Sequence, residues 1–271
     1  MDNTITVILI GILEGLTEFL PISSTGHLII ASSLLSLNGA EVKAFLVVIQ
    51  LGAILAVCWY QRLTIYNTLA ELPNKRWNSF AVKIAAAFIP TACIGLLFHD
   101  VVKTYLFSPI SVSCALILGG VVIIFVENKN KLPREIPPED ITVPQAIKIG
   151  FFQSLAIFPG VSRSGATIIG GLSIGLPRKT ATLFSFLLAI PTMFAATVFD
   201  LAQTPELLTS SALPALTLGF CVAFITALLT VKVLINFVSK HSFKPFGYYR
   251  ILFGLIILMT WESGLIEWQS I

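Results

Sequence analysis

Two short polar motifs interrupt apolar sequence and carry the residue types needed for phosphate chemistry. The first, at 14–27, reads EGLTEFLPISSTGH and holds two glutamates, two serines, two threonines and a histidine. The second, at 159–167, reads PGVSRSGAT and centres on an arginine between two serines. An ionisable group at the bilayer centre costs on the order of a few kcal/mol unless it faces protein or a wet cavity. We therefore interpret both motifs as parts of a functional site.

The two carboxylates of the first motif are spaced for joint action. Glu14 and Glu18 are four residues apart, so a helix would project both from one face. Two like charges this close oppose each other unless a cation lies between them. The pair therefore indicates a divalent metal held through oxygen ligands, or a proton site. Two glutamates that merely extend to the lipid headgroups are the non-functional alternative.

The hydroxyl groups that follow are suited to an anion. Ser23, Ser24 and Thr25 come just before an apolar helix, so their backbone N–H groups and those of Gly26 and His27 face the loop. The start of a helix attracts phosphate. His27 lies three residues beyond Ser24, where an imidazole can serve as base or nucleophile. A serine cap with a hydrogen-bonded core histidine is the alternative.

The second motif supplies a cation for the same anion. Arg163 is flanked by Ser162 and Ser164, with Thr167 one turn further on. An always-charged guanidinium beside hydroxyls at a helix start is well suited to binding phosphate. Without an anion, Arg163 would need one of the two glutamates of the first motif as its partner, in a purely structural ion pair.

Composition places these motifs in a membrane protein. The chain has 271 residues, of which 56% are hydrophobic and 11% charged, against about 25% charged in soluble domains. Its mean hydropathy is +0.90. Apolar runs long enough to span a bilayer predict an all-α polytopic membrane protein. The expected spanning helices are 42–60, 80–98, 109–126, 180–199, 212–234 and 246–261.

A repeat organises these helices. Shifting the sequence by 139 positions lays 11–30 over 150–169 with seven of twenty residues identical, which indicates a duplicated unit. Pro and Gly break each copy in the middle, and non-helical backbone at membrane depth requires protein or a wet cavity around it. The arms, roughly 14 residues each, are too short to span singly. We therefore expect each copy to form a re-entrant helical hairpin.

Three spanning helices follow each hairpin, and this odd number inverts the second copy relative to the first. The fold we predict is two inverted-topology repeats, each a re-entrant hairpin plus three transmembrane helices, with the hairpin tips meeting at a midplane site. The expected organisation is one integral membrane domain over 1–271, with repeat one at 1–126, a linker at 127–143 and repeat two at 144–271.

Basic residues predict the orientation. Fourteen Lys and Arg residues, Arg250 among them, fall on one face of this topology and two on the other, with Arg163 assigned to the membrane interior. The positive-inside rule makes the first face cytoplasmic. Both chain ends would then lie outside.

With these residues in view, the chain resembles the bacterial undecaprenyl-diphosphate phosphatases of the bacitracin-resistance family along nearly its whole length. EGLTEFLPISSTGH is similar to the family's first motif and PGVSRSGAT to its second; FLVVIQLGAILAV and GLLFHD are also similar to family segments. The resemblance implies catalytic roles for Glu18, Ser24, His27 and Arg163, and metal binding by Glu14 and Glu18. The substrate-binding residues that we expect beside them are Ser23, Thr25, Gly26, Ser162, Ser164 and Thr167.

The implied reaction is hydrolysis of undecaprenyl diphosphate to undecaprenyl phosphate and inorganic phosphate, which recycles the lipid carrier of cell-wall synthesis and confers resistance to bacitracin. A divalent cation, Mg²⁺ or Ca²⁺, is the implied cofactor. The expected setting is the bacterial cytoplasmic (inner) membrane, with the site toward its outer face. The expected partners are the polyprenyl diphosphate and membrane lipids, not nucleic acid, and a homodimer is left open. Either Ser24, with His27 as base, or His27 itself would attack the phosphorus.

The alternative is a lipid-phosphate flippase or transporter, because inverted repeats with broken helices are also a transporter design. Such a carrier needs an anion clamp. It has no need of a Ser24 and His27 pair beside two carboxylates suited to a metal.

Overall fold

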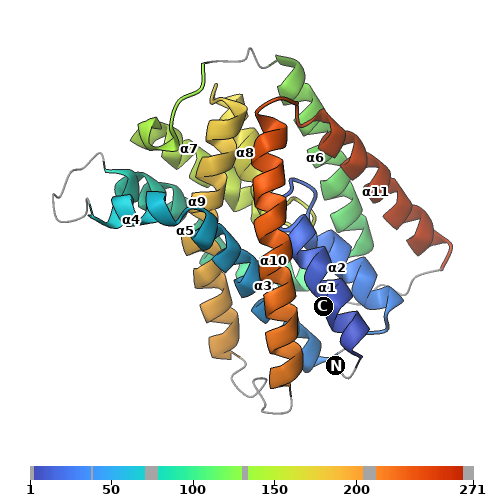
Figure 1. Ribbon diagram of the computed structural model, residues 1–271. Helices are drawn as coiled ribbons and strands as arrows, with labels where there is room; N and C mark the ends of the chain where they lie inside the picture. The colour runs from blue at the N-terminus through green and yellow to red at the C-terminus, as the bar shows by residue number, and fades with distance from the viewer. Residues whose placement is uncertain (1–2, 38, 71–78, 130–133, 204–211, 265–271) are drawn as a thin grey trace.

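The protein is helical throughout the part of the chain that the structure describes. The computed structural model describes residues 3–37, 39–70, 79–129, 134–203 and 212–264, and all regular elements in these ranges are helices (Figure 1). Within them, five helices are long and apolar enough to cross a membrane, which confirms a multi-pass membrane protein. These are α3 (Ala40–Tyr60), α5 (Phe80–Tyr105), α6 (Pro109–Lys129), α9 (Arg178–Gln203) and α10 (Leu213–Val238).

The sixth expected span is a helix of a different character. α11 (Lys244–Glu262) has 19 residues. Its first half is more polar than the five long helices, because it contains Lys244, Tyr248, Tyr249 and Arg250. Its role as a span therefore stays a prediction. The assignment of Arg250 to a cytoplasmic loop was wrong: the residue is 1% exposed and donates to backbone carbonyls of three segments. Burial among carbonyls satisfies a charge that the sequence pattern had placed in water.

Two broken helical hairpins lie where the motifs predict them. α1 (Thr4–Thr17) and α2 (Ser24–Leu34) flank the first break, and α7 (Val143–Ser154), a short η3 turn (Leu155–Ile157) and α8 (Arg163–Ser173) flank the second. α2 and α8 each have 11 residues, and their first residues are 139 positions apart. The predicted interruptions of helix are thus confirmed.

Both breaks use a serine in an unusual backbone conformation. Ser23 has φ 71° and Ser162 has φ 72°. Residues other than glycine rarely adopt a positive φ, and it costs on the order of 1 kcal/mol. Each serine caps the helix that follows, because its Oγ accepts the N–H of Gly26 or Gly165. The cap offsets the strain and fixes the direction in which α2 and α8 leave the loop.

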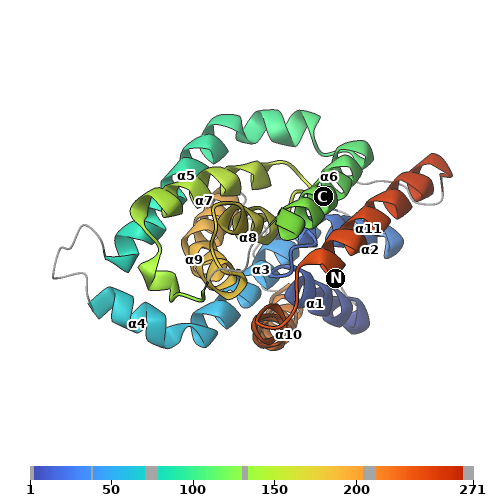
Figure 2. The same cartoon turned by 90° about the horizontal axis from the view of Figure 1, so that it is seen from above.

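The hairpins are held in place by the longer helices. Figure 2 shows α8 and α9 in the middle of the molecule, with α5 and α7 on one side and α3 on another. α10 packs closely on α1 and α3. At Gly52 of α3, a Cβ would lie 2.4 Å from the Phe220 carbonyl oxygen of α10. Such close backbone contacts are typical of membrane helix pairs, and they make a rigid frame around the loops.

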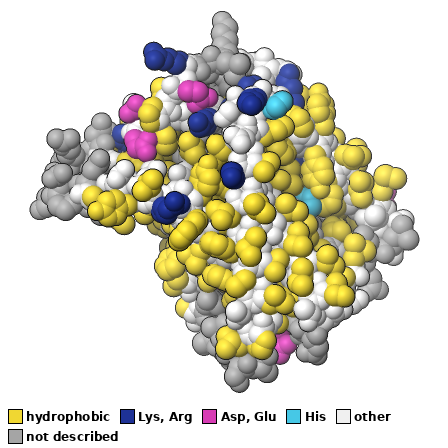
Figure 3. Space-filling view, in the orientation of Figure 1, with side chains coloured by type: hydrophobic (Ala, Val, Ile, Leu, Met, Phe, Trp, Pro, Cys, Tyr) yellow, Lys and Arg dark blue, Asp and Glu magenta, His cyan; other side chains and the backbone are white. Residues whose placement is uncertain are grey.

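Charged side chains gather at one end of this frame. In Figure 3 most Lys and Arg side chains lie on the upper half of the visible face, and the lower half is largely hydrophobic. At the same end, Glu127 of α6 forms a 2.5 Å ion pair with Arg178 of α9 and also accepts the N–H of Phe243. Two further short helices are α4 (Arg62–Ala70), which leaves the bundle at its side (Figure 1), and η2 (Pro138–Asp140), which packs against α9.

Candidate active site

A cavity of about 300 Å³ lies where the two helix breaks meet. Its wall combines residues of both sequence motifs with polar side chains of the surrounding helices. The lining residues are Glu18, Ser23, Ser24, Thr25, Gln50, Thr91, Gln153, residues 156–160, Ser162, Arg163, Thr192, Met193 and Ala196. Six of the residues singled out in the sequence therefore share one cavity, although up to 145 positions separate them along the chain.

Glu18 joins the two motifs. Its Oε1 lies 2.9 Å from Nη2 of Arg163, and its Oε2 accepts a 2.5 Å hydrogen bond from the Ser24 hydroxyl. The carboxylate is only 7% exposed, so water screens these contacts little. One buried carboxylate thus holds both a cation and a hydroxyl that is placed to lose its proton.

Arg163 keeps part of its hydrogen-bonding capacity free. Nη2 donates to Glu18 and contacts the Met193 sulfur at 2.8 Å. Nε and Nη1 are buried and have no hydrogen-bond partner among the described residues. A buried donor without a partner costs about 1–3 kcal/mol, and more when charged. The geometry therefore favours an anion with several oxygens at this guanidinium.

Two helix starts strengthen the preference for an anion. Ser24 is the first residue of α2 and Arg163 the first of α8, and both line the cavity. The N-terminus of a helix carries a partial positive charge and free N–H groups. Their convergence at one cavity is the arrangement that phosphate binding requires.

Glu14 is buried near the first break but does not line the cavity. It is 1% exposed, and neither carboxylate oxygen has a hydrogen-bond partner among the described residues. A bare carboxylate costs several kcal/mol to bury, so Glu14 must hold a proton or a cation. Oxygen donors of this kind fit Mg²⁺ or Ca²⁺. No group of three His, Cys, Asp or Glu side chains gathers here within the described ranges.

His27 points its ring nitrogens away from Ser24. Nδ1 lies 2.7 Å from the carbonyl oxygen of Ser23, and Nε2 lies 2.6 Å from the hydroxyl of Tyr249 on α11. Its ring stacks on Phe253 with centroids 4.2 Å apart. His27 is not among the described residues that line the cavity. The sequence placed His27 one turn from Ser24, but the structure gives Ser24 a different partner, Glu18.

Three other expected ligands have structural contacts and do not line the cavity. Ser164 and Thr167 are fully buried. The Ser164 hydroxyl donates to the Leu20 carbonyl across the two breaks, and that of Thr167 to the Arg163 carbonyl. Gly26 is buried against α6 and α11. Ser164 thus joins the two breaks, and contact with substrate stays a prediction for all three residues.

Sequence reasoning missed part of the cavity wall. Gln153 is fully buried, and its Nε2 donates to the hydroxyls of Thr91 and Thr192. The 139-residue shift places Gln153 on Glu14, which was an available signal. Arg250 was also missed, although a charge inside an apolar helix is itself a signal of function.

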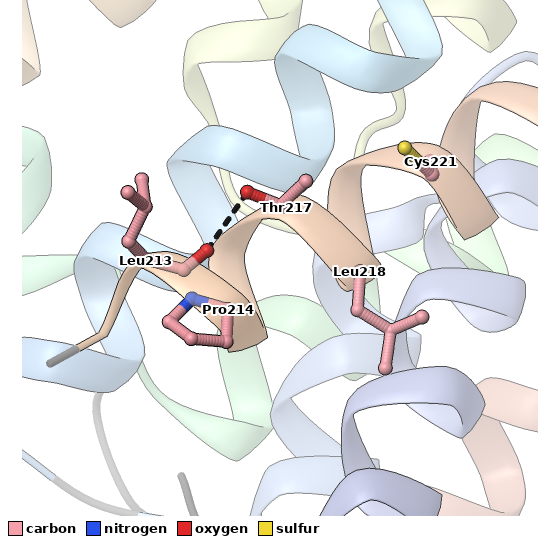
Figure 4. A pocket seen from close by; sticks show the side chains of 5 residues that line it. All are labelled: Leu213, Pro214, Thr217, Leu218 and Cys221. Atoms are coloured by element: carbon pink, nitrogen blue, oxygen red, sulfur yellow. Dashed lines mark hydrogen bonds between the residues drawn. The ribbon is translucent and has the colours of Figure 1, made fainter.

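A second hollow lies at the start of α10 and is not suited to chemistry. It is lined by Leu213, Pro214, Thr217, Leu218 and Cys221 (Figure 4). Its one hydroxyl, on Thr217, donates to the Leu213 carbonyl at 2.8 Å. No charged side chain contributes to this hollow within the described ranges, so the cavity between the breaks is the better candidate site.

Comparison with known proteins gives a consistent result. The family model described as bacitracin resistance protein BacA matches residues 7–256. An undecaprenyl-diphosphatase of Ectopseudomonas mendocina is 48% identical over 264 residues, covering 97% of this chain and 96% of that protein. One of Aromatoleum aromaticum is 47% identical over 273 residues and the full length of both chains. One of Nitrosomonas eutropha is 49% identical over 266 residues, covering 98% and 97%.

Proposed function

The chain belongs to the bacitracin resistance protein BacA family, and we propose how its cavity carries out the reaction. It is an undecaprenyl-diphosphate phosphatase: it converts undecaprenyl diphosphate to undecaprenyl phosphate and inorganic phosphate, and so returns the lipid carrier to cell-wall synthesis. One observation carries this conclusion. A buried guanidinium with two free nitrogens stands beside a hydroxyl that is already hydrogen-bonded to a carboxylate.

Arg163 binds the terminal phosphate in this proposal. Its Nε and Nη1 donate to phosphate oxygens, and the N-termini of α2 and α8 add their partial positive charges. The remaining polar wall includes Gln50, which is available to the second phosphate, and Gln153, whose Oε1 has no partner among the described residues and can accept from water. The prenyl tail stays among the exposed apolar side chains of the spanning helices.

Ser24 is the nucleophile and Glu18 its base. Oγ of Ser24 attacks the terminal phosphorus, its proton passes to Glu18, and the bond from phosphorus to the bridging oxygen breaks. Undecaprenyl phosphate leaves with that oxygen. Water then hydrolyses the phosphoserine, and Glu18 returns the proton to Ser24. We assign the base role to Glu18 rather than His27 because Glu18 is the group in hydrogen-bond contact with the hydroxyl.

A divalent cation, Mg²⁺ or Ca²⁺, fits the donor set. Glu14, whose two oxygens are without partners, would hold it, and Glu18 is the second candidate ligand. Two carboxylates are few protein ligands for such an ion, which commonly keeps several waters. When bound, the cation would neutralise charge on the phosphate oxygens.

We also infer inverted repeats and an outward-facing site in the cytoplasmic membrane. The equal lengths and spacing of α2 and α8, and the matched serine caps, support the duplication. α1 begins at the lower end of the molecule in Figure 1, and the segment before α7 lies at the upper end. The basic upper end supports a cytoplasmic position there.

The test is phosphate release from undecaprenyl diphosphate by the purified protein in detergent, with and without chelator. We expect release by the wild type and its loss in Ser24→Ala. Labelling with ³²P in the terminal phosphate and rapid acid quench should trap a phosphoserine in wild type. Unchanged release by folded Ser24→Ala would contradict the assignment of the nucleophile, and no release by folded wild type with Mg²⁺ or Ca²⁺ would contradict the function.

A further inference from the structure

The hydrogen bond between Tyr249 of α11 and His27 has no part in the mechanism above. Through His27, it nevertheless connects α11 to Ser23, the residue before the nucleophile. We propose that Tyr249 is a positioning residue for this reaction: its hydroxyl donates to Nε2 of His27 and fixes the orientation of the ring, and His27 in turn holds the Ser23 carbonyl that sets the direction of Ser24. This inference rests on the proposed function.

The acceptor at Nδ1 decides the tautomer. The Ser23 carbonyl oxygen can only accept, and it lies 2.7 Å from Nδ1 of His27. In the neutral ring, Nδ1 therefore carries the hydrogen and Nε2 carries a lone pair. The Tyr249 hydroxyl, 2.6 Å from Nε2, donates to that lone pair. Without this donor, Nε2 of His27 has lost its partner, and one hydrogen bond, that from Nδ1 to Ser23, fixes the ring instead of two.

The carbonyl that His27 holds belongs to a strained residue. Ser23 has φ 71° and is 2% exposed, so its peptide needs support from its surroundings. The next residue is Ser24, whose hydroxyl is 2.5 Å from Glu18. A rotation of the peptide between these two serines moves the Ser24 hydroxyl relative to the phosphorus. Displacements of about 1 Å at a reacting group cost on the order of a hundredfold in rate.

α11 is a firm support for this chain of contacts. Arg250, the residue after Tyr249, donates to the Pro21 carbonyl of the first break and to the Gly160 and Val161 carbonyls of the second. One turn beyond Tyr249, Phe253 stacks on the His27 ring. One helix therefore fixes both loops and the imidazole. Deleting one oxygen atom, that of the Tyr249 hydroxyl, is enough to remove the hydrogen bond to His27.

The test compares Tyr249→Phe with Tyr248→Phe. Both changes remove one hydroxyl and keep the ring. Tyr248 is the preceding residue on α11 and is 60% exposed, so its variant is the matched control. We expect kcat of Tyr249→Phe to fall about tenfold to a hundredfold, with KM and the midpoint of thermal unfolding close to those of the control. In ¹⁵N NMR of histidine-labelled protein, the Nε2 shift of His27 should move in Tyr249→Phe, because Nε2 loses the hydroxyl that donates to it.

A kcat for Tyr249→Phe within twofold of the Tyr248→Phe value overturns the proposal, and so do unchanged His27 shifts. A fall in kcat that comes with a clearly lower midpoint of thermal unfolding than the control would indicate a general packing role, and it also overturns the proposal. The NMR comparison needs no turnover. If wild type releases no phosphate, the proposed function fails, whereas the spectra still decide whether Tyr249 holds the imidazole.

Discussion

Replacing Arg163 by lysine separates charge from hydrogen-bond geometry at the phosphate. Lysine keeps a cation near Glu18 but lacks the counterparts of Nε and Nη1, the two nitrogens that have no partner among the described residues. Each hydrogen bond to a charged group contributes about 1.5–3 kcal/mol, so two of them amount to roughly 3–6 kcal/mol. At 1.36 kcal/mol per factor of ten, this range is about a hundredfold to ten-thousandfold in kcat/KM.

We expect Arg163→Lys to lose about a hundredfold to a thousandfold, since lysine retains the charge. The assay is initial phosphate release from undecaprenyl diphosphate in detergent, over substrate concentrations that give kcat and KM separately. Arg178→Lys is the control, because Arg178 also pairs with a buried glutamate, Glu127, but does not line the cavity. The control should stay within threefold of wild type. If Arg163→Lys keeps more than a tenth of wild-type kcat/KM, the free nitrogens do not bind the phosphate.

Three further changes test other parts of the site and frame. Glu18→Gln removes the base and should lower kcat about 10²–10⁴-fold; a folded variant with more than a tenth of wild-type kcat would move that role elsewhere. Glu14→Gln should raise the Mg²⁺ concentration for half-maximal activity about tenfold or more, and an unchanged metal titration would exclude Glu14 as a ligand. Gly52→Ala places a Cβ 2.4 Å from the Phe220 carbonyl, whereas Gly95→Ala meets nothing within 4 Å. Thermal unfolding in detergent should show about 1–3 kcal/mol of destabilisation for the first and none for the second.

Local chemistry explains why the helix breaks could be predicted. Pro21 and the adjacent Pro159 and Gly160 lie in the two breaks, close to the serines that cap the following helices, and the break positions agree with the structure. Proline alone was not sufficient, because Pro90 and Pro191 lie inside the continuous helices α5 and α9. Uncharged runs likewise predicted the five long helices. These features depend on neighbours in the sequence, which a single chain displays directly.

The partners of individual side chains depend on distant segments and could not be read in this way. Spacing alone placed His27 beside Ser24, but its ring nitrogens bond the Ser23 carbonyl and Tyr249, and its ring stacks on Phe253, more than 220 positions away. Arg250 was counted as a loop charge. Its local sequence does not show the five backbone carbonyls, from three regions of the chain, that accept its hydrogen bonds. An ion pair of Arg163 with Glu14 or Glu18 was the alternative that the sequence left open, and in the structure the partner is Glu18.

The ion pair between Glu18 and Arg163 also affects which anions can bind in the cavity. With Glu18 as internal counter-ion, the empty cavity is close to electroneutral at this point, and an incoming anion has to compete with a carboxylate for the guanidinium. A singly charged ion such as chloride offers less attraction than the carboxylate already in place, and it cannot use two nitrogens of a planar fork. A phosphate group with two charges and several oxygens satisfies both conditions. The resting pair therefore favours a phosphate group over monovalent anions at Arg163.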